Sequence, residues 1–178
     1  MHRFSKLIVA AAFGSGCCLL AQTMGSYINE TKEAYDHVKN NILRAAEEMP
    51  EQDYSFQPTP EIRTFGQLVG HIADAQAHFC SAVDNTHMQL HAASRKTKAD
   101  IVAALKESSE ECDKAYASVT EANAGQMVGA GRMQRTRLGM LNMNIAHDNE
   151  EYGYMSVYLR LKGHVPPSSQ SRAVPVRK

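Results

Sequence analysis

The segment that decides the fold spans residues 138–159 and reads LGMLNMNIAHDNEEYGYMSVYL. Large apolar residues occur on more than one helical face of this segment, which predicts a largely buried helix. Its middle nevertheless carries His147, Asp148, Glu150 and Glu151. Burying one unpaired polar group costs about 1–3 kcal/mol, and an unpaired charge costs more. A metal ion would compensate that cost, because His147 and Glu151, four residues apart, share one helical face.

The rest of the chain indicates further helices. Apolar residues recur at three and four positions in four segments, at about residues 23–49, 65–83, 98–119 and 133–162. Thr64 and Thr97 are the predicted N-caps of the second and third helices. Residues 51–63 contain two prolines and no regular spacing of apolar residues, which predicts an extended connection. No strand pattern is present, so the sequence predicts an all-α four-helix bundle of the up-and-down type with a long first connection.

The two ends of the chain differ from the predicted bundle. Residues 1–6 form a short basic segment, and residues 7–21 are apolar or small throughout. This is the pattern of a signal peptide. We therefore expect residues 1–21 to be cleaved, with export to the periplasm and no stable membrane insertion afterwards; a mobile N-terminal tail is the alternative. The bundle would then occupy residues 22–167. Residues 168–178 are too poor in apolar side chains to fold, which predicts a disordered tail.

The charge balance limits the class of partner. Lys+Arg and Asp+Glu both number 19, so no basic excess draws the protein onto nucleic acid. We expect no nucleic-acid partner and a small-molecule substrate whose identity is unknown. A homodimer is compatible with this composition.

The cysteines bear on the compartment. If cleavage follows Ala21, Cys80 and Cys112 are the two cysteines that remain. In an oxidising compartment such a pair can bridge neighbouring helices, although cysteines on helices are also common as small buried hydrophobes. We predict the disulfide, with two buried thiols as the alternative.

Three runs of the sequence resemble the DinB-like family. They are FGQLVGHIAD at residues 65–74, AHDNEEYG at residues 146–153 and YLRLKGHVPPSS at residues 158–169. The resemblance covers nearly all of the chain after the predicted signal peptide. It implies a four-helix bundle that holds a divalent metal through one His on the second helix and two His, four apart, on the last. Family members include transferases and isomerases that use low-molecular-weight thiols, beside many without a known activity.

Carried over by position, the family's metal ligands correspond to His71 and His147, while Glu151 stands where the family usually has its third His. A Glu oxygen binds such ions at about 2.0–2.2 Å, and two His with one carboxylate is a known set for zinc hydrolases and non-haem iron. The resemblance therefore implies a divalent zinc, nickel or iron ion at His71, His147 and Glu151. The alternative is a degenerate site, with His71 hydrogen-bonded on the bundle flank and Glu151 paired to an Arg or Lys.

Other polar residues are weaker candidates for the same site. His78 lies two turns beyond His71 and could replace it as a ligand. Asp74 and Asp148 could accept hydrogen bonds that orient the imidazoles, a role that metal-bound His require of some neighbour.

The expected function is that of an exported DinB-like metal-binding protein. It would be a metal-dependent hydrolase or a thiol-type transferase using a metal-activated water or thiol. Enzymatic activity stays open, because no Ser or Cys with a recognisable nucleophile motif stands beside the predicted ligands. The alternative is a non-catalytic bundle that binds a metal or small ligand, with a degenerate site.

Overall fold

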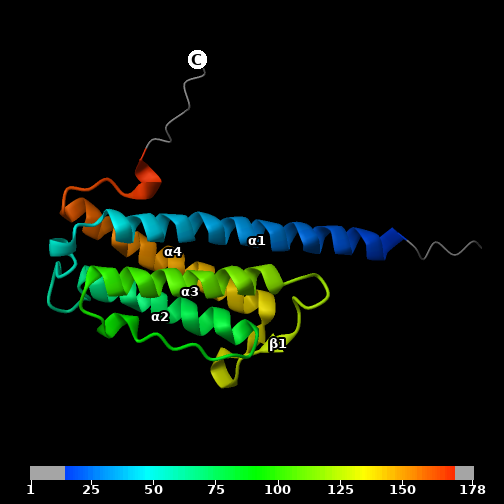
Figure 1. Ribbon diagram of the computed structural model, residues 1–178. Helices are drawn as coiled ribbons and strands as arrows, with labels where there is room; N and C mark the ends of the chain where they lie inside the picture. Colours follow the sequence, from blue (N-terminus) through cyan, green and yellow to red (C-terminus); the bar gives the residue numbers. More distant parts are fainter. Residues whose placement is uncertain (1–14, 171–178) are drawn as a thin grey trace, which may run out of the picture.

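The computed structural model describes residues 15–170, and side chains from residue 24 onward. Four helices pack side by side (Figure 1): α1 (Ser15–Glu48), α2 (Phe65–Val83), α3 (Lys98–Ser118) and α4 (Arg137–Leu161). This arrangement confirms the all-α four-helix bundle. The N-terminal part of α1 extends past the other three helices (Figure 1). The first 14 residues of the predicted signal peptide lie outside the described residues, so its cleavage stays a prediction.

Helix starts follow the predicted caps. Thr64 and Gln67 form a reciprocal capping box at α2, and the Thr97 hydroxyl accepts the Asp100 N–H at the start of α3. Helix α4 begins a turn later than predicted, because Thr136 caps it by accepting the Gly139 N–H at 3.0 Å.

Short elements occupy the connections. Four 3-10 turns lie at Glu51–Asp53, Ala92–Ser94, Gly131–Met133 and Pro167–Ser169. Strands β1 (Met127–Val128) and β2 (Arg135–Thr136) pair antiparallel, with Met127 opposite Thr136. These strands were not predicted, because two residues are too few to show an alternating pattern of apolar and polar side chains.

The connectivity differs from a simple up-and-down bundle. Helix α1 runs toward one end, α2 and α3 both run away from it, and α4 returns (Figure 1). Near the helix starts, a Cβ atom at Gly66 would lie 3.3 Å from Ile101 Cδ1. Near the helix ends, the Cα atoms of Cys80 and Cys112 are 4.9 Å apart. Helices α2 and α3 are therefore parallel, and the second connection is long as well as the first.

The second connection, residues 84–97, is long enough to return along α2. A chain of that length reaches about 46 Å when extended, whereas the 19 residues of α2 span only about 28 Å. It packs against α2 at Gly70, where a Cβ atom would lie 2.5 Å from Ala93 Cα. One turn on, Asp74 accepts the N–H groups of Ala92 and Ala93 at 2.8 and 3.1 Å. Asp74 thus holds this connection. The prediction from the sequence, that Asp74 orients an imidazole, is therefore wrong.

Replacing Gly70 with Ala is expected to lower the free energy of unfolding by about 1–3 kcal/mol, the usual cost of overpacking. The added methyl group would collide with the backbone of the returning connection. Gly153→Ala is the matched control, because Gly153 is an exposed helical glycine with nothing within 4 Å of its Cβ position. Gly153→Ala should raise the free energy of unfolding by about 0.5–1 kcal/mol. Thermal unfolding measures both, and a wild-type melting temperature for Gly70→Ala would contradict the close approach.

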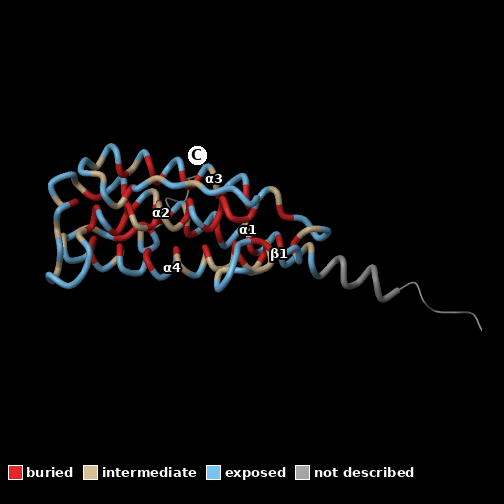
Figure 2. Tube along the Cα trace, turned by 90° about the horizontal axis from the view of Figure 1, so that it is seen from below, coloured by how far each residue is buried: buried red, intermediate tan, exposed pale blue. Residues whose placement is uncertain are grey.

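Two apolar clusters fill the bundle, and the buried residues face its interior (Figure 2). One cluster includes Phe65 and Leu159, and the other includes Phe79 and Leu141. Between them along α2, α3 and α4 lies a layer of buried polar side chains, which we call the polar belt: Gln76, Ser108, Ser109, Asn144 and Asp148.

The chain stays ordered beyond the predicted end of the bundle. The Tyr152 hydroxyl donates to Ser168 Oγ and accepts the Ser168 N–H, both at 2.9 Å. The Gln170 amide donates to Glu48 at 2.7 Å. Residues 168–170, expected to be disordered, are therefore held against α1 and α4, while residues 171–178 lie outside the described part.

Over the described residues, none of the helices combines the length and the apolar content needed to span a bilayer.

Candidate metal centre

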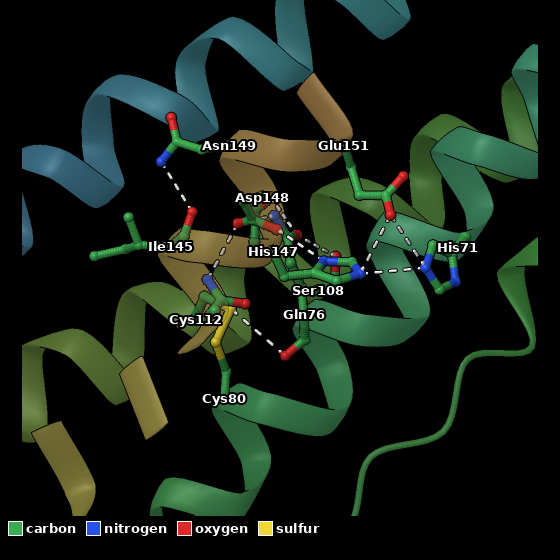
Figure 3. A network of polar contacts seen from close by, with 12 residues as sticks. His71, Gln76, Cys80, Ser108, Cys112, Ile145, His147, Asp148, Asn149 and Glu151 are labelled. Carbon is green, nitrogen blue, oxygen red and sulfur yellow. Dashed lines mark hydrogen bonds and ion pairs between the residues drawn. A yellow bond between two sulfur atoms is a disulfide. The ribbon is translucent and has the colours of Figure 1, made fainter. Parts of the chain in front are cut away.

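Three side chains meet on the flank of the bundle, His71 from α2 and His147 and Glu151 from α4 (Figure 3). His71 Nε2 lies 3.2 Å from His147 Nε2 and 3.5 Å from Glu151 Oε1. His147 Nε2 lies 3.6 Å from the same Glu151 oxygen. The structure therefore brings all three predicted ligand residues together, with one donor atom of each at the corner of a triangle. We call this group the donor triangle.

The donor triangle has the size that a tetrahedral metal ion requires. Two ligand atoms bonded at about 2.1 Å to such an ion lie about 3.4 Å apart, close to the observed sides of 3.2, 3.5 and 3.6 Å. Three protein ligands leave the fourth position of a tetrahedral ion open. The residues present thus fit a divalent ion in both chemistry and spacing.

Burial shifts the pKa values of His71 and Glu151 in the donor triangle. The side chains of His71, His147 and Glu151 are 31%, 19% and 9% exposed. Burial lowers the pKa of His71, and the electrostatic effects of Arg63 and His147 lower it further. A neutral imidazole is the form that binds a metal. Burial also raises the pKa of Glu151, against the opposing effect of His147 and Arg63. A cation in the donor triangle would offset that cost by stabilising the ionised carboxylate.

The degenerate-site alternative required an Arg or Lys beside Glu151. Within the described part of the chain, the ion-pair partners of Glu151 are His71 and His147 instead. The geometry therefore favours a site that can hold an ion over a simple surface pair.

Asp148 lies behind the donor triangle, in the polar belt. Its Oδ2 accepts hydrogen bonds from Gln76 at 2.9 Å and Asn144 at 3.1 Å. Its Oδ1 lies 3.9 Å from His147 Nδ1, too far for a hydrogen bond, and neither atom has another partner among the described residues. Burial raises the pKa of Asp148, although hydrogen bonds oppose that effect. The carboxylate faces the ring nitrogen that a metal-bound His147 would use as donor, as the sequence suggested.

Gln76 and Ser108 are polar-belt residues that the sequence did not reveal as part of this region. Gln76 Oε1 accepts from Ser108 Oγ at 2.8 Å, which fixes the amide that donates to Asp148. The available signal was the spacing of Gln76, which lies four residues after Ile72 and three before Phe79 in the apolar stripe of α2.

His78 is not part of the donor triangle. The side chain is exposed, and its ring lies against Phe79 with 5.6 Å between ring centroids. The idea that it replaces His71 as a ligand is therefore not supported by the geometry.

A cleft of about 760 Å³ adjoins the donor triangle and shares Glu151 with it. The first connection, the start of α2 and the second half of α4 form its wall: Gln57, Pro60, Glu61, Ile62, Arg63, Gln67, Leu68, Glu151, Tyr154 and Tyr158. Its volume lies within the range of small-molecule sites. A small molecule in the cleft would therefore lie beside Glu151, one of the three residues of the donor triangle.

Comparison with known proteins agrees with this architecture. The DinB superfamily matches residues 34–155. A DinB-like protein from Bacillus cereus ATCC 10987 superposes with a TM-score of 0.67 at 16% identity, over 77% of this chain and 93% of that one. A DinB-like protein from Bacillus subtilis superposes with a TM-score of 0.62 at 20% identity, over 79% and 99%. No curated protein matches the sequence. With the family match extending over most of its length, the chain belongs to the DinB superfamily.

Proposed function

We propose that this protein binds one divalent metal ion at His71, His147 and Glu151 and uses it in hydrolysis or group transfer on a small molecule. The observation that carries the proposal is that Glu151 belongs both to the donor triangle and to the wall of the cleft. Three protein ligands with an open fourth position are typical of catalytic zinc sites, whereas structural sites are closed.

The bound zinc, nickel or iron ion supplies Lewis acidity, which lowers the pKa of a neighbouring water or thiol. The chain's own residues hold that ion and shape the space beside it. His71 and His147 donate as neutral imidazoles, and Glu151 adds one negative charge. Gln76 holds Asp148 in the polar belt, where Asp148 Oδ1 lies 3.9 Å from His147 Nδ1. A hydrogen bond between these two atoms would favour one orientation of the His147 ring.

A non-catalytic role is the second candidate, and a specific observation favours it. The Tyr158 hydroxyl donates to the Arg63 carbonyl, and the Tyr154 hydroxyl donates to Glu150. Both phenols in the cleft wall are therefore engaged, which leaves them poorly placed as general acids. On this reading the protein binds a metal or a small ligand without turnover, so metal-dependent hydrolysis of an ester or thioester separates the two candidates.

We further propose export to the periplasm, supported by the basic and apolar start of the sequence and by the Cys80–Cys112 disulfide. Disulfides persist mainly in oxidising compartments. N-terminal sequencing of protein from the native host tests export, and an intact Met1 in a cytosolic fraction would contradict it.

Elemental analysis of protein purified without an affinity tag should find about one divalent ion per chain. Changing Glu151 to Gln should weaken zinc binding at least about a hundredfold, because altering groups that merely orient ligands already costs about 10–100-fold. Glu150→Gln is the matched control, since Glu150 is exposed and outside the donor triangle. Equal zinc affinity of the two variants would contradict Glu151 as a ligand.

A further inference from the structure

The wall of the cleft beside the donor triangle combines charged and apolar side chains. Glu151 is the wall residue that the cleft shares with the donor triangle, and Ile62, Leu68 and Tyr154 give the wall an apolar part. Arg63 adds one positive charge. A ligand that fills this cleft would therefore meet a cation at the donor triangle and a second cation at Arg63.

The backbone of Arg63 is fixed where it joins the cleft. Its carbonyl accepts the Tyr158 hydroxyl at 2.6 Å, which ties the first connection to α4. Directly afterwards, the N–H groups of Phe65 and Gly66 donate to Phe56 and Tyr54 at 2.9 and 2.8 Å. These hydrogen bonds fix the backbone from which the Arg63 side chain extends.

The guanidinium of Arg63 is available to a ligand. No ion pair or hydrogen bond engages it among residues 24–170, and the residue is exposed. The other charged side chain of the first connection in the wall, Glu61, is exposed.

We propose that Arg63 is a specificity-determining residue that binds the carboxylate of the substrate. The substrate class is then a small molecule with a carboxylate at one end, a metal-binding group at the other and an apolar body between them. A planar carboxylate matches the two-pronged guanidinium, and such charge-assisted pairs are among the stronger hydrogen bonds. This inference rests on the proposed metal site.

Hydroxamates of graded length test the inference on the zinc-loaded full chain. The probes are the monohydroxamates of succinic, adipic and suberic acids, each compared with the alkyl hydroxamate of the same chain length. Both members of a pair bind zinc through the same head group, and one alone carries a terminal carboxylate. At the length that spans the cleft, the acid should bind at least about tenfold more tightly, which corresponds to about 1.4 kcal/mol.

Arg63→Gln should remove this preference, so that the acid and the alkyl hydroxamate of each length bind with equal affinity. Arg132→Gln is the matched control, because Arg132 is exposed and lies in the connection before α4, outside the cleft wall. If the alkyl hydroxamates bind but no acid binds more tightly, the metal site stands and the carboxylate subsite is wrong. A preference that survives Arg63→Gln also overturns it. If zinc or the alkyl hydroxamates fail to bind, the proposed function fails and this inference fails with it.

Discussion

Replacing His71 and His147 together with Ala should abolish binding of a divalent ion and leave the helical circular dichroism largely intact. The double change removes two corners of the donor triangle, and the Glu151 carboxylate that remains cannot hold the ion alone. Both imidazoles lie on the bundle flank, 31% and 19% exposed, so their loss opens no large cavity in the core. Elemental analysis after dialysis against zinc should fall from about one ion per chain to none.

The control for this experiment is His78→Ala, which removes an exposed imidazole from the same helix and should keep the full zinc content. Thermal denaturation gives a second readout. A ligand at about a hundred times its dissociation constant stabilises the native state by about 2.7 kcal/mol. Zinc should thus raise the melting temperature of wild type and His78→Ala but not of the double variant. Unchanged zinc content in the double variant would overturn the assignment of ligands.

The sequence could place part of the metal centre because part of it lies within one helix. His147 and Glu151 are four residues apart, and helical geometry alone puts them on one face. His71 comes from another helix, so no spacing rule could bring it to them; the family resemblance of residues 65–74 supplied that match. The structure then shows the three donor atoms within 3.6 Å of one another.

Features that depend on how the helices pack against one another could not be predicted from the sequence. The parallel direction of α2 and α3 follows from the return of residues 84–97 along α2, and periodicity says nothing about which end of a helix a loop reaches. Asp74 has two backbone N–H partners in that connection, a role invisible until Gly70 and Ala93 are seen in contact. The cleft could not be predicted from the sequence either, because its wall combines residues that are far apart in the chain, such as Arg63 and Tyr158.

The disulfide between Cys80 and Cys112, present in the structure, is expected to contribute strongly to stability. It closes a loop with a sequence separation of 32. In the chain-entropy model, a loop of that size corresponds to about 3–4 kcal/mol. The loop contains the whole connection between α2 and α3, so the bridge restricts the unfolded chain where these parallel helices have no short turn to keep them together. Urea unfolding of the oxidised and reduced protein measures the difference.

The double variant Cys80→Ala/Cys112→Ala provides the matched control, because it should unfold at or slightly below the midpoint of the reduced wild type and should not respond to added reductant. Both sulfur positions are fully buried, between α2 and α3, so a modest loss from the two vacated volumes adds to the entropic effect. Peptide mapping after alkylation under denaturing, non-reducing conditions should find neither Cys80 nor Cys112 labelled. If both are labelled in protein from the native host, or if reduction leaves the unfolding midpoint unchanged, the bridge does not stabilise the fold. Without that bridge, the case for an oxidising compartment would rest on the N-terminal sequence alone.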